Sequence, residues 1–122
     1  MNNIQKKKEP IWDLEERTGV FGENVILFCR KVPIDPITSP LITQLVKAGT
    51  SIGANYCEAD DAESKKDFRH KIGIVKKESR ESKHFIRMMA VAVPKLKDDA
   101  KPLWQEAKEL NLIFNSIFKK VK

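Results

Sequence analysis

Apolar and small residues recur along most of the chain at alternating steps of three and four, in four successive segments. This spacing places side chains on one stripe of a helix, because an α-helix turns about once every 3.6 residues. The stripes of the segments are Leu14, Phe21, Val25, Phe28 and Val32; Leu45, Gly49, Ile52, Tyr56 and Ala59; Phe68, Ile72, Val75, Ser79, Ser82, Ile86, Met89 and Val93; and Leu103, Ala107, Leu110, Phe114, Ile117 and Val121. No stretch sustains the alternation of a strand, so the pattern predicts four helices.

Prolines and capping residues predict where the helices begin and end. The two prolines within 32–36 exclude a helix interior there. Ser39, followed by a proline, is expected to cap the second helix, and Ser64, three residues before Asp67, to cap the third. The pair Val93-Pro94 is expected to end the third helix, and the acidic residues Asp98 and Asp99, with Pro102, to open the fourth.

Short connections favour antiparallel packing between helices that are neighbours in sequence. We therefore predict an all-α fold, an antiparallel up-down-up-down four-helix bundle spanning residues 11–122, after a flexible basic tail at residues 1–10. A chain of 122 residues is long enough for one core. It contains no apolar run long enough to span a membrane. Cys29 and Cys57 fit no disulfide framework or zinc motif, so we expect free, buried thiols and a cytoplasmic location.

The second helix contains a ridge of small residues, Gly49, Gly53 and Cys57, spaced four apart. Each glycine costs a helix about 1 kcal/mol relative to alanine. Close approach of another helix backbone would offset that cost, and Ser79 and Ser82 of the third helix could face the ridge. The alternative is that the glycines break the helix and form a loop.

The net charge of +6 is unevenly distributed. Residues 34–63 carry a net charge of −4, and residues 64–97 carry eleven basic and three acidic side chains, a net charge of +8. Within the predicted third helix, five cations follow the rhythm of the apolar stripe one residue later. Three further lysines and the exposed side of Lys71 widen this basic stripe. Its candidate contact residues are Lys65, Lys66, Arg69, Lys76, Lys77, Arg80, Lys83 and Arg87.

A row of cations on a rigid helix suits a polyanion, so these eight residues are candidates for contact with RNA or DNA backbone. Base-specific reading is not indicated, because only Phe85 lies near this stripe. Two alternatives remain open. The stripe could be a solvated surface with intrahelical pairs such as Lys77–Glu81. It could also pair, within the chain or between subunits, with the acidic residues Glu58, Asp60, Asp61 and Glu63, which would make the protein an oligomeric scaffold without a nucleic-acid role.

Catalytic and metal-binding motifs are weak. Glu81-x-x-His84 is one half of the pattern that holds a di-metal centre in helical bundles, so we expect no metal, no cofactor and no enzyme activity. A polar line of Ser51, Asn55 and Glu58 runs beside the second helix's apolar stripe, and we expect a structural role in which Glu58 pairs with Arg80 or Lys77. The polar residues of structural or interface interest are Ser51, Asn55, Glu58, Glu78 and Glu81.

Several motifs resemble the four-helix-bundle family of 23S rRNA intervening-sequence proteins. They are the run 51–59 (SIGANYCEA), the run 64–68 (SKKDF), the run 77–81 (KESRE), Asp13-Leu14 with Arg17-Thr18, Phe21 and Val25, and Glu106-x-x-Glu109-Leu110. The resemblance implies a bacterial, antiparallel bundle that assembles into a homopentamer, and relatedness to the RNA-associated accessory variability proteins of diversity-generating retroelements. It implies self-association and a possible rRNA or other nucleic-acid partner, and it carries over no catalytic residue and no small-molecule substrate.

Overall fold

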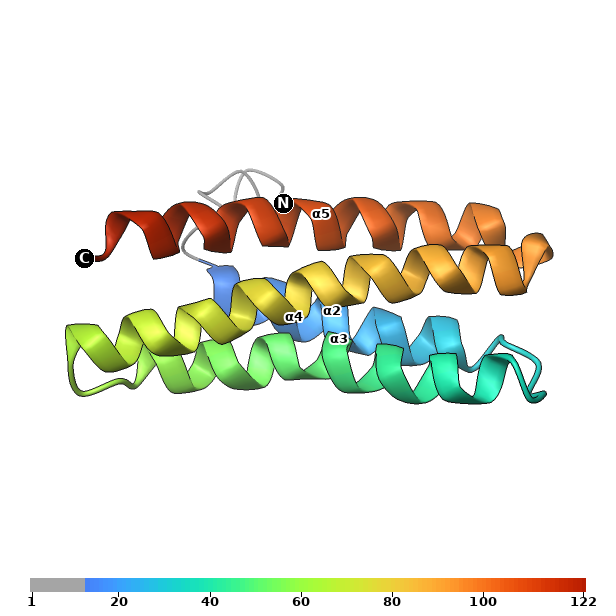
Figure 1. The fold of residues 1–122 in the computed structure, drawn as a ribbon, viewed down its shortest axis with the longest axis horizontal. Helices are drawn as coiled ribbons and strands as arrows, with labels where there is room; N and C mark the ends of the chain where they lie inside the picture. The colour runs from blue at the N-terminus through green and yellow to red at the C-terminus, as the bar shows by residue number, and fades with distance from the viewer. Residues whose placement is uncertain (1–12) are drawn as a thin grey trace, which may run out of the picture.

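A computed structural model describes residues 13–122 of the chain. It contains helices α2 (Leu14–Cys29), α3 (Thr38–Asp60), α4 (Lys65–Ala92) and α5 (Lys97–Lys120), with a short 3-10 turn, η2 (Pro94–Leu96), between the last two. Consecutive helices run antiparallel, side by side along one long axis (Figure 1). The predicted all-α, up-down-up-down bundle is confirmed. The tail predicted at residues 1–10 lies outside the described residues.

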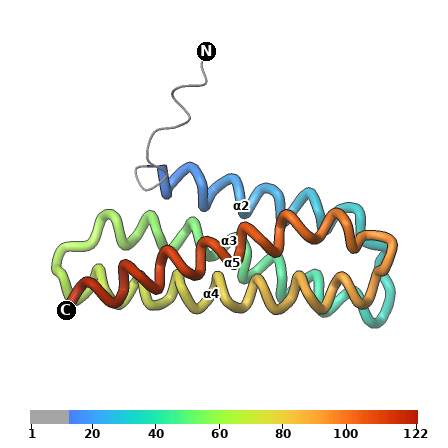
Figure 2. The backbone as a smooth tube through the Cα atoms, turned by 90° about the horizontal axis from the view of Figure 1, so that it is seen from above, coloured from blue at the N-terminus to red at the C-terminus, as the bar shows by residue number. Residues whose placement is uncertain are grey.

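The helices pack mainly on their sequence neighbours. α4 lies along both α3 and α5, and α2 lies along α3, whereas α2 and α5 make fewer contacts. Figure 2 shows the bundle turned by 90°, with the same four rods running lengthwise. α4 is therefore held on two sides, and its remaining surface faces away from the bundle.

The core follows the predicted stripes. Every stripe residue of α4 from Ile72 to Met89 is buried, and so are the stripe residues of α5 from Leu103 to Phe114. Tyr56, Phe68, Ile117 and Val121, at the ends or edges of their stripes, are only partly buried. Two buried positions in α4 are polar. The Ser79 hydroxyl donates to the Val75 carbonyl oxygen at 2.8 Å, while the Ser82 hydroxyl has no hydrogen-bond partner.

The glycine ridge of α3 does lie against another helix, but that helix is α2 and not α4. A Cβ atom on Gly49 would lie 2.8 Å from Cγ2 of Val25, and one on Gly53 would lie 3.4 Å from the Thr18 carbonyl. The α3 helix runs through both glycines without a break, so the loop alternative is wrong. The close approach explains why two helix-weakening residues lie in mid-helix.

Three of the predicted helix boundaries are confirmed, and one cap is corrected. Ser64 caps α4 by accepting the Asp67 amide at 3.0 Å, and α4 ends before Val93-Pro94. The two aspartates lie in the first turn of α5, which begins at Lys97, whereas Pro102 lies inside the helix and not at its opening. Ser39 does not cap α3. The carboxylate of Asp35 accepts the amides of Ile37 and Thr38, each at 2.8 Å, and the helix therefore begins at Thr38. These hydrogen bonds lower the pKa of Asp35, and the one from the Thr38 amide has the largest effect.

The two thiols differ in their surroundings. Cys29 is buried and free as expected, and desolvation raises its pKa to about 11. Cys57 is free but exposed, so the expectation that both thiols are buried is wrong for Cys57. Cys57 lies four residues after Gly53, a spacing that predicts a place on the same buried ridge. Over two helical turns, however, that ridge rotates away from α2 and leaves Cys57 facing outward.

The tight α2–α3 contact predicts opposite effects for two glycine substitutions. Gly49→Ala gains helix propensity but forces the new Cβ against the stiff side chain of Val25, which should lower the free energy of unfolding by about 1–2 kcal/mol. Gly19→Ala is the matched control, because nothing lies within 4 Å of its Cβ position, and it should raise stability by up to about 1 kcal/mol. Urea unfolding of both variants measures the two effects. Equal stabilisation by both substitutions would contradict the close contact.

Candidate nucleic-acid interface

The burial of the α4 stripe determines where the eight candidate cations lie. Five are exposed: Lys65, Lys66, Lys77, Arg80 and Arg87. The other three, Arg69, Lys76 and Lys83, are half-buried in the groove between α4 and α5. The predicted basic stripe therefore divides into an outward-facing set and a set that contacts α5.

Each half-buried cation has partners in or after α5. Arg69 Nε donates to the Val121 carbonyl oxygen at 2.6 Å, and its guanidinium carbon lies 3.7 Å from the centre of the Phe118 ring. Lys76 Nζ donates to Asn115 Oδ1 at 3.1 Å and lies 4.4 Å from the same ring. These cation–π and hydrogen-bond contacts fasten the two helices together.

The five exposed cations form no ion pair within the described part of the chain. The possible pair Lys77–Glu81 is therefore not formed. The acidic end of α3 does not neutralise them either, since only Glu58 of that run makes an ion pair, and its partner is Lys71. The positive charge of α4 is thus available to a partner outside the chain.

Glu58 pairs with Lys71, at 2.7 Å, instead of with Arg80 or Lys77 as expected. The chain reverses between Asp60 and Lys65, so residues near the end of α3 meet residues near the start of α4. Lys77 and Arg80 lie six and nine residues further along α4, about 9 and 14 Å along the helix axis. The hydrogen bond that Lys71 donates to Glu58 is the largest of the effects that raise the pKa of Lys71.

The other polar candidates have local partners. Ser51 donates to the Lys47 carbonyl oxygen at 2.6 Å, and Asn55 donates to that of Ser51 at 2.9 Å, both within α3. Glu78 is half-buried, and desolvation raises its pKa, whereas Glu81 is exposed. The five polar residues are spread along two helices, and the structure does not gather them into one cluster.

The α5 helix adds cations that the sequence analysis missed. A row with alternating steps of four and three runs along its side next to α4: Lys97, Lys101, Trp104, Lys108, Asn111, Asn115, Phe118 and Lys122. Its four lysines are exposed. The segment 98–122 has a net charge of only +1, which concealed the row, although the spacing of its members is visible in the sequence.

We call the five exposed cations of α4 and the four lysines of this row together the basic face; the last of these lysines, Lys122, follows the end of α5. It consists of Lys65, Lys66, Lys77, Arg80, Arg87, Lys97, Lys101, Lys108 and Lys122. A hollow of about 760 Å³ lies at one end of this face. Residues from the start of α4 line it on one side, and Phe118 and Lys122 line it on the other. Two helices can therefore contact one polyanion at the same time.

Aromatic rings are closer to this face than expected. Trp104 lies between Lys83 and Lys108, whose Nζ atoms are 5.7 and 5.6 Å from the centre of its indole ring. Phe85, the one aromatic residue expected near the stripe, stacks edge-on with His84 and borders a hollow with Gln44 of α3. Lys77 and Arg80 line the same hollow, so the rings near the cations come from both α4 and α5.

Residues 13–122 contain neither a metal-binding cluster nor a membrane-spanning helix. These residues contain no group of three histidine, cysteine or acidic side chains placed to hold a metal ion. None of the helices described is both long and apolar enough to cross a membrane.

The model of one protein family, the 23S rRNA-intervening sequence protein, matches residues 16–116. The chain belongs to this family. A crystal structure of a protein of unknown function from the S23 ribosomal protein family of Bacteroides thetaiotaomicron has the same fold, with a TM-score of 0.74 and 23% sequence identity over 86% of this chain and 97% of that chain. Among curated proteins none matches.

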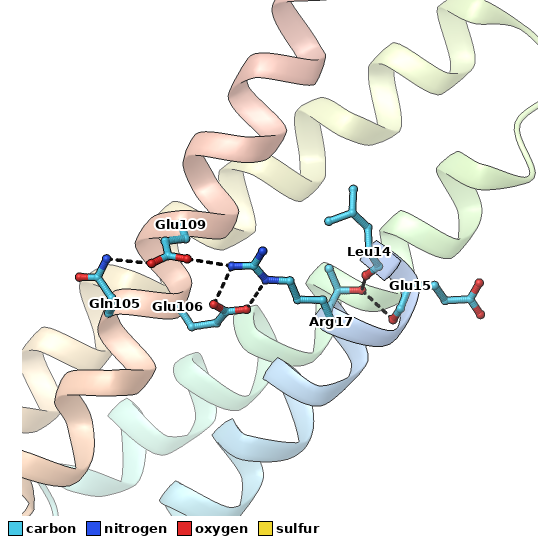
Figure 3. Close-up of polar contacts among 7 residues, drawn as sticks. Leu14, Glu15, Arg17, Gln105, Glu106 and Glu109 are labelled. Atoms are coloured by element: carbon cyan, nitrogen blue, oxygen red, sulfur yellow. Dashed lines mark hydrogen bonds and ion pairs between the residues drawn. The ribbon is translucent and has the colours of Figure 1, made fainter. Parts of the chain in front are cut away.

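In this member of the intervening-sequence protein family, two separate parts of the sequence signature meet in space (Figure 3). Arg17 of α2 donates to both carboxylate oxygens of Glu106, at 2.6 and 2.9 Å, and to Glu109 at 2.9 Å. Gln105 donates to the other oxygen of Glu109 at 3.1 Å. The hydrogen bond with Glu106 is the largest of the effects that raise the pKa of Arg17.

This network joins α2 and α5, which have the smallest contact of any two α-helices that touch. A bidentate arginine–carboxylate contact fixes the register between two helices more tightly than a single lysine pair does. The signature residues 17, 106 and 109 therefore have a structural role in the bundle, on the side opposite to α4's outward surface.

Proposed function

We propose that this chain is a non-enzymatic, cytoplasmic helical-bundle protein that binds RNA or DNA backbone through α4 and works as a homo-oligomer. The observation that supports the proposal is the row of exposed cations on α4, which have no ion-pair partner among residues 13–122. Binding of phosphates to such a row releases condensed counterions, which favours association at low salt.

The dimensions of the row fit a nucleic acid. Lys66 and Arg87 are 21 residues apart on one continuous helix, about 32 Å along its axis. This length is close to one turn of a duplex, about 34 Å. The lysines of α5 widen the contact, so the face can follow a strand of phosphates along its length.

A second candidate function is an oligomeric scaffold whose charged faces pair between subunits. The observation that favours it is the exposed acidic end of α3, where Asp60, Asp61 and Glu63 have no ion pair within the described residues. In that case reversing the charge of Lys77 and Arg80 would dissociate the oligomer. Nucleic-acid binding would be absent from the start.

Self-association has separate support from α2. Val20 and Leu27 lie seven residues apart on one side of this helix, and both are exposed, Leu27 to 58%. Ile26, about 100° further round the same helix, is exposed as well, and we call these three residues the α2 patch. Such a patch is typical of a surface that a partner subunit covers.

Removal of two exposed cations should weaken nucleic-acid binding. The double variant Lys77→Ala/Arg80→Ala is expected to bind structured RNA about tenfold more weakly, at about 0.7 kcal/mol per lost contact. The slope of log Kd against log salt should fall by about two, because two phosphate contacts are lost. Fluorescence anisotropy over a salt series measures both quantities.

The matched control for that variant is Arg30→Ala/Lys47→Ala, which removes the same charge from exposed positions outside the basic face. Its affinity should stay close to that of the parent protein. No binding at low salt, binding that does not depend on salt, or an equal loss in the control would each contradict the proposal.

Introduction of a charge into the α2 patch should disrupt the oligomer. Leu27→Glu is expected to lower the molecular mass in sedimentation to that of a single chain, because an unpaired carboxylate would be buried at the contact. Leu112→Glu is the control, since Leu112 of α5 is also 58% exposed but lies outside the patch. A monomeric parent protein, or an unchanged mass for Leu27→Glu, would contradict this assignment.

A further inference from the structure

A cleft of about 710 Å³ lies between the C-terminal part of α4 and the first turns of α5. The buried side chains of Ile86 and Ala100 contribute to its lining, and the half-buried Trp104 forms part of its wall. Its volume is within the range of small-molecule sites, about 300–1,000 Å³. We call it the Trp104 cleft.

Cations surround this apolar cleft. Arg87, Lys97 and Lys101 line it and are exposed. The ammonium groups of Lys83 and Lys108 lie over the indole ring, so a base that stacks on the ring must displace one of these flexible side chains. No carboxylate is among the described residues that line it. Asp98 offsets part of the charge of Lys101, with 3.6 Å between the two charged groups, and the other four cations have no ion pair within residues 13–122.

This combination of an aromatic wall, an apolar interior and a ring of positive charge has a specific chemical complement. The occupant must be flat and apolar at its centre and must carry negative charge at its edge. A nucleobase with its flanking phosphates meets both requirements. Proteins that bind single strands use this design, with bases stacked on aromatic side chains and a basic groove along the backbone.

We propose that the Trp104 cleft binds an unpaired base of a single nucleic-acid strand, stacked on Trp104, with the adjoining phosphates on Arg87, Lys97 and Lys108. The assignment rests on the proposed function and deepens it, because it places a single-stranded segment next to the phosphate-binding row of α4. A base inside a duplex is already stacked and paired, so a duplex can engage the basic face but not the cleft.

Trp104 provides its own probe. The chain has two tryptophans, so Trp12→Phe leaves Trp104 as the only one. This protein is titrated at low salt with three ligands: a single-stranded RNA of about 12 nucleotides, an abasic strand of equal length, and a duplex of the same length. We expect the base-containing single strand to quench the Trp104 fluorescence, and the abasic strand and the duplex to bind without quenching it.

A pair of substitutions tests the stacking. Trp104→Leu retains an apolar side chain but removes the flat ring, so it should lower the ratio of single-strand to duplex affinity by about five- to tenfold, within the range that loss of one stacked base produces. Trp104→Phe should restore most of that ratio. Thermal unfolding of both variants identifies any loss of folded protein.

The outcomes separate the inference from the proposed function. The inference is wrong and the backbone proposal stands if the duplex binds but the base-containing strand leaves the Trp104 fluorescence unquenched. The same conclusion follows if the ratio of single-strand to duplex affinity is equal in the parent protein, Trp104→Leu and Trp104→Phe. Quenching by a free mononucleotide at the same concentration as by the strand would make the cleft a nucleotide site and overturn the assignment. If no nucleic acid binds at low salt, both proposals fail.

Discussion

The stripe of α4 from Ile72 to Met89 is buried between α3 and α5, and this packing constrains the rest of the molecule. Burial of one stripe fixes the orientation of the helix about its own axis. It therefore also determines which of the other residues face water. Three of the five cations one residue beyond the stripe, Arg69, Lys76 and Lys83, fall into the groove with α5. Arg80 and Arg87 are exposed, and so are the three lysines that widen the row. The same hydrophobic contact that stabilises the bundle therefore displays its charge.

Much of the bundle could be predicted from the spacing of apolar residues alone, since helical periodicity is a local property of the sequence. Ser64 was predictable as a cap for the same reason, because its partner Asp67 is three residues away. The partner of the Gly49–Gly53 ridge was not predictable. Small residues show that a backbone comes close, but not which one, and here α2 takes the place expected for α4.

The candidate site was predictable only in part, for a similar reason. The cations of α4 are visible as a row within one segment of the sequence. The side chains that they contact belong to α5, and most of these lie far from the cations in the sequence. Trp104 and Phe118 meet Lys83, Arg69 and Lys76 only through the antiparallel pairing of the two helices. The Arg17–Glu106 contact, 89 residues apart in sequence, likewise requires the bundle to close.

Contact between phosphate and the basic face can be followed by a titration of ¹⁵N-labelled protein with a short RNA duplex at low salt, read out as amide chemical shifts. We expect shifts concentrated at the exposed positions from Lys66 to Arg87 and at the lysines of the α5 row, and we expect them to disappear at high salt. Shifts concentrated on α2 and α3, or no shifts at low salt, would contradict this contact.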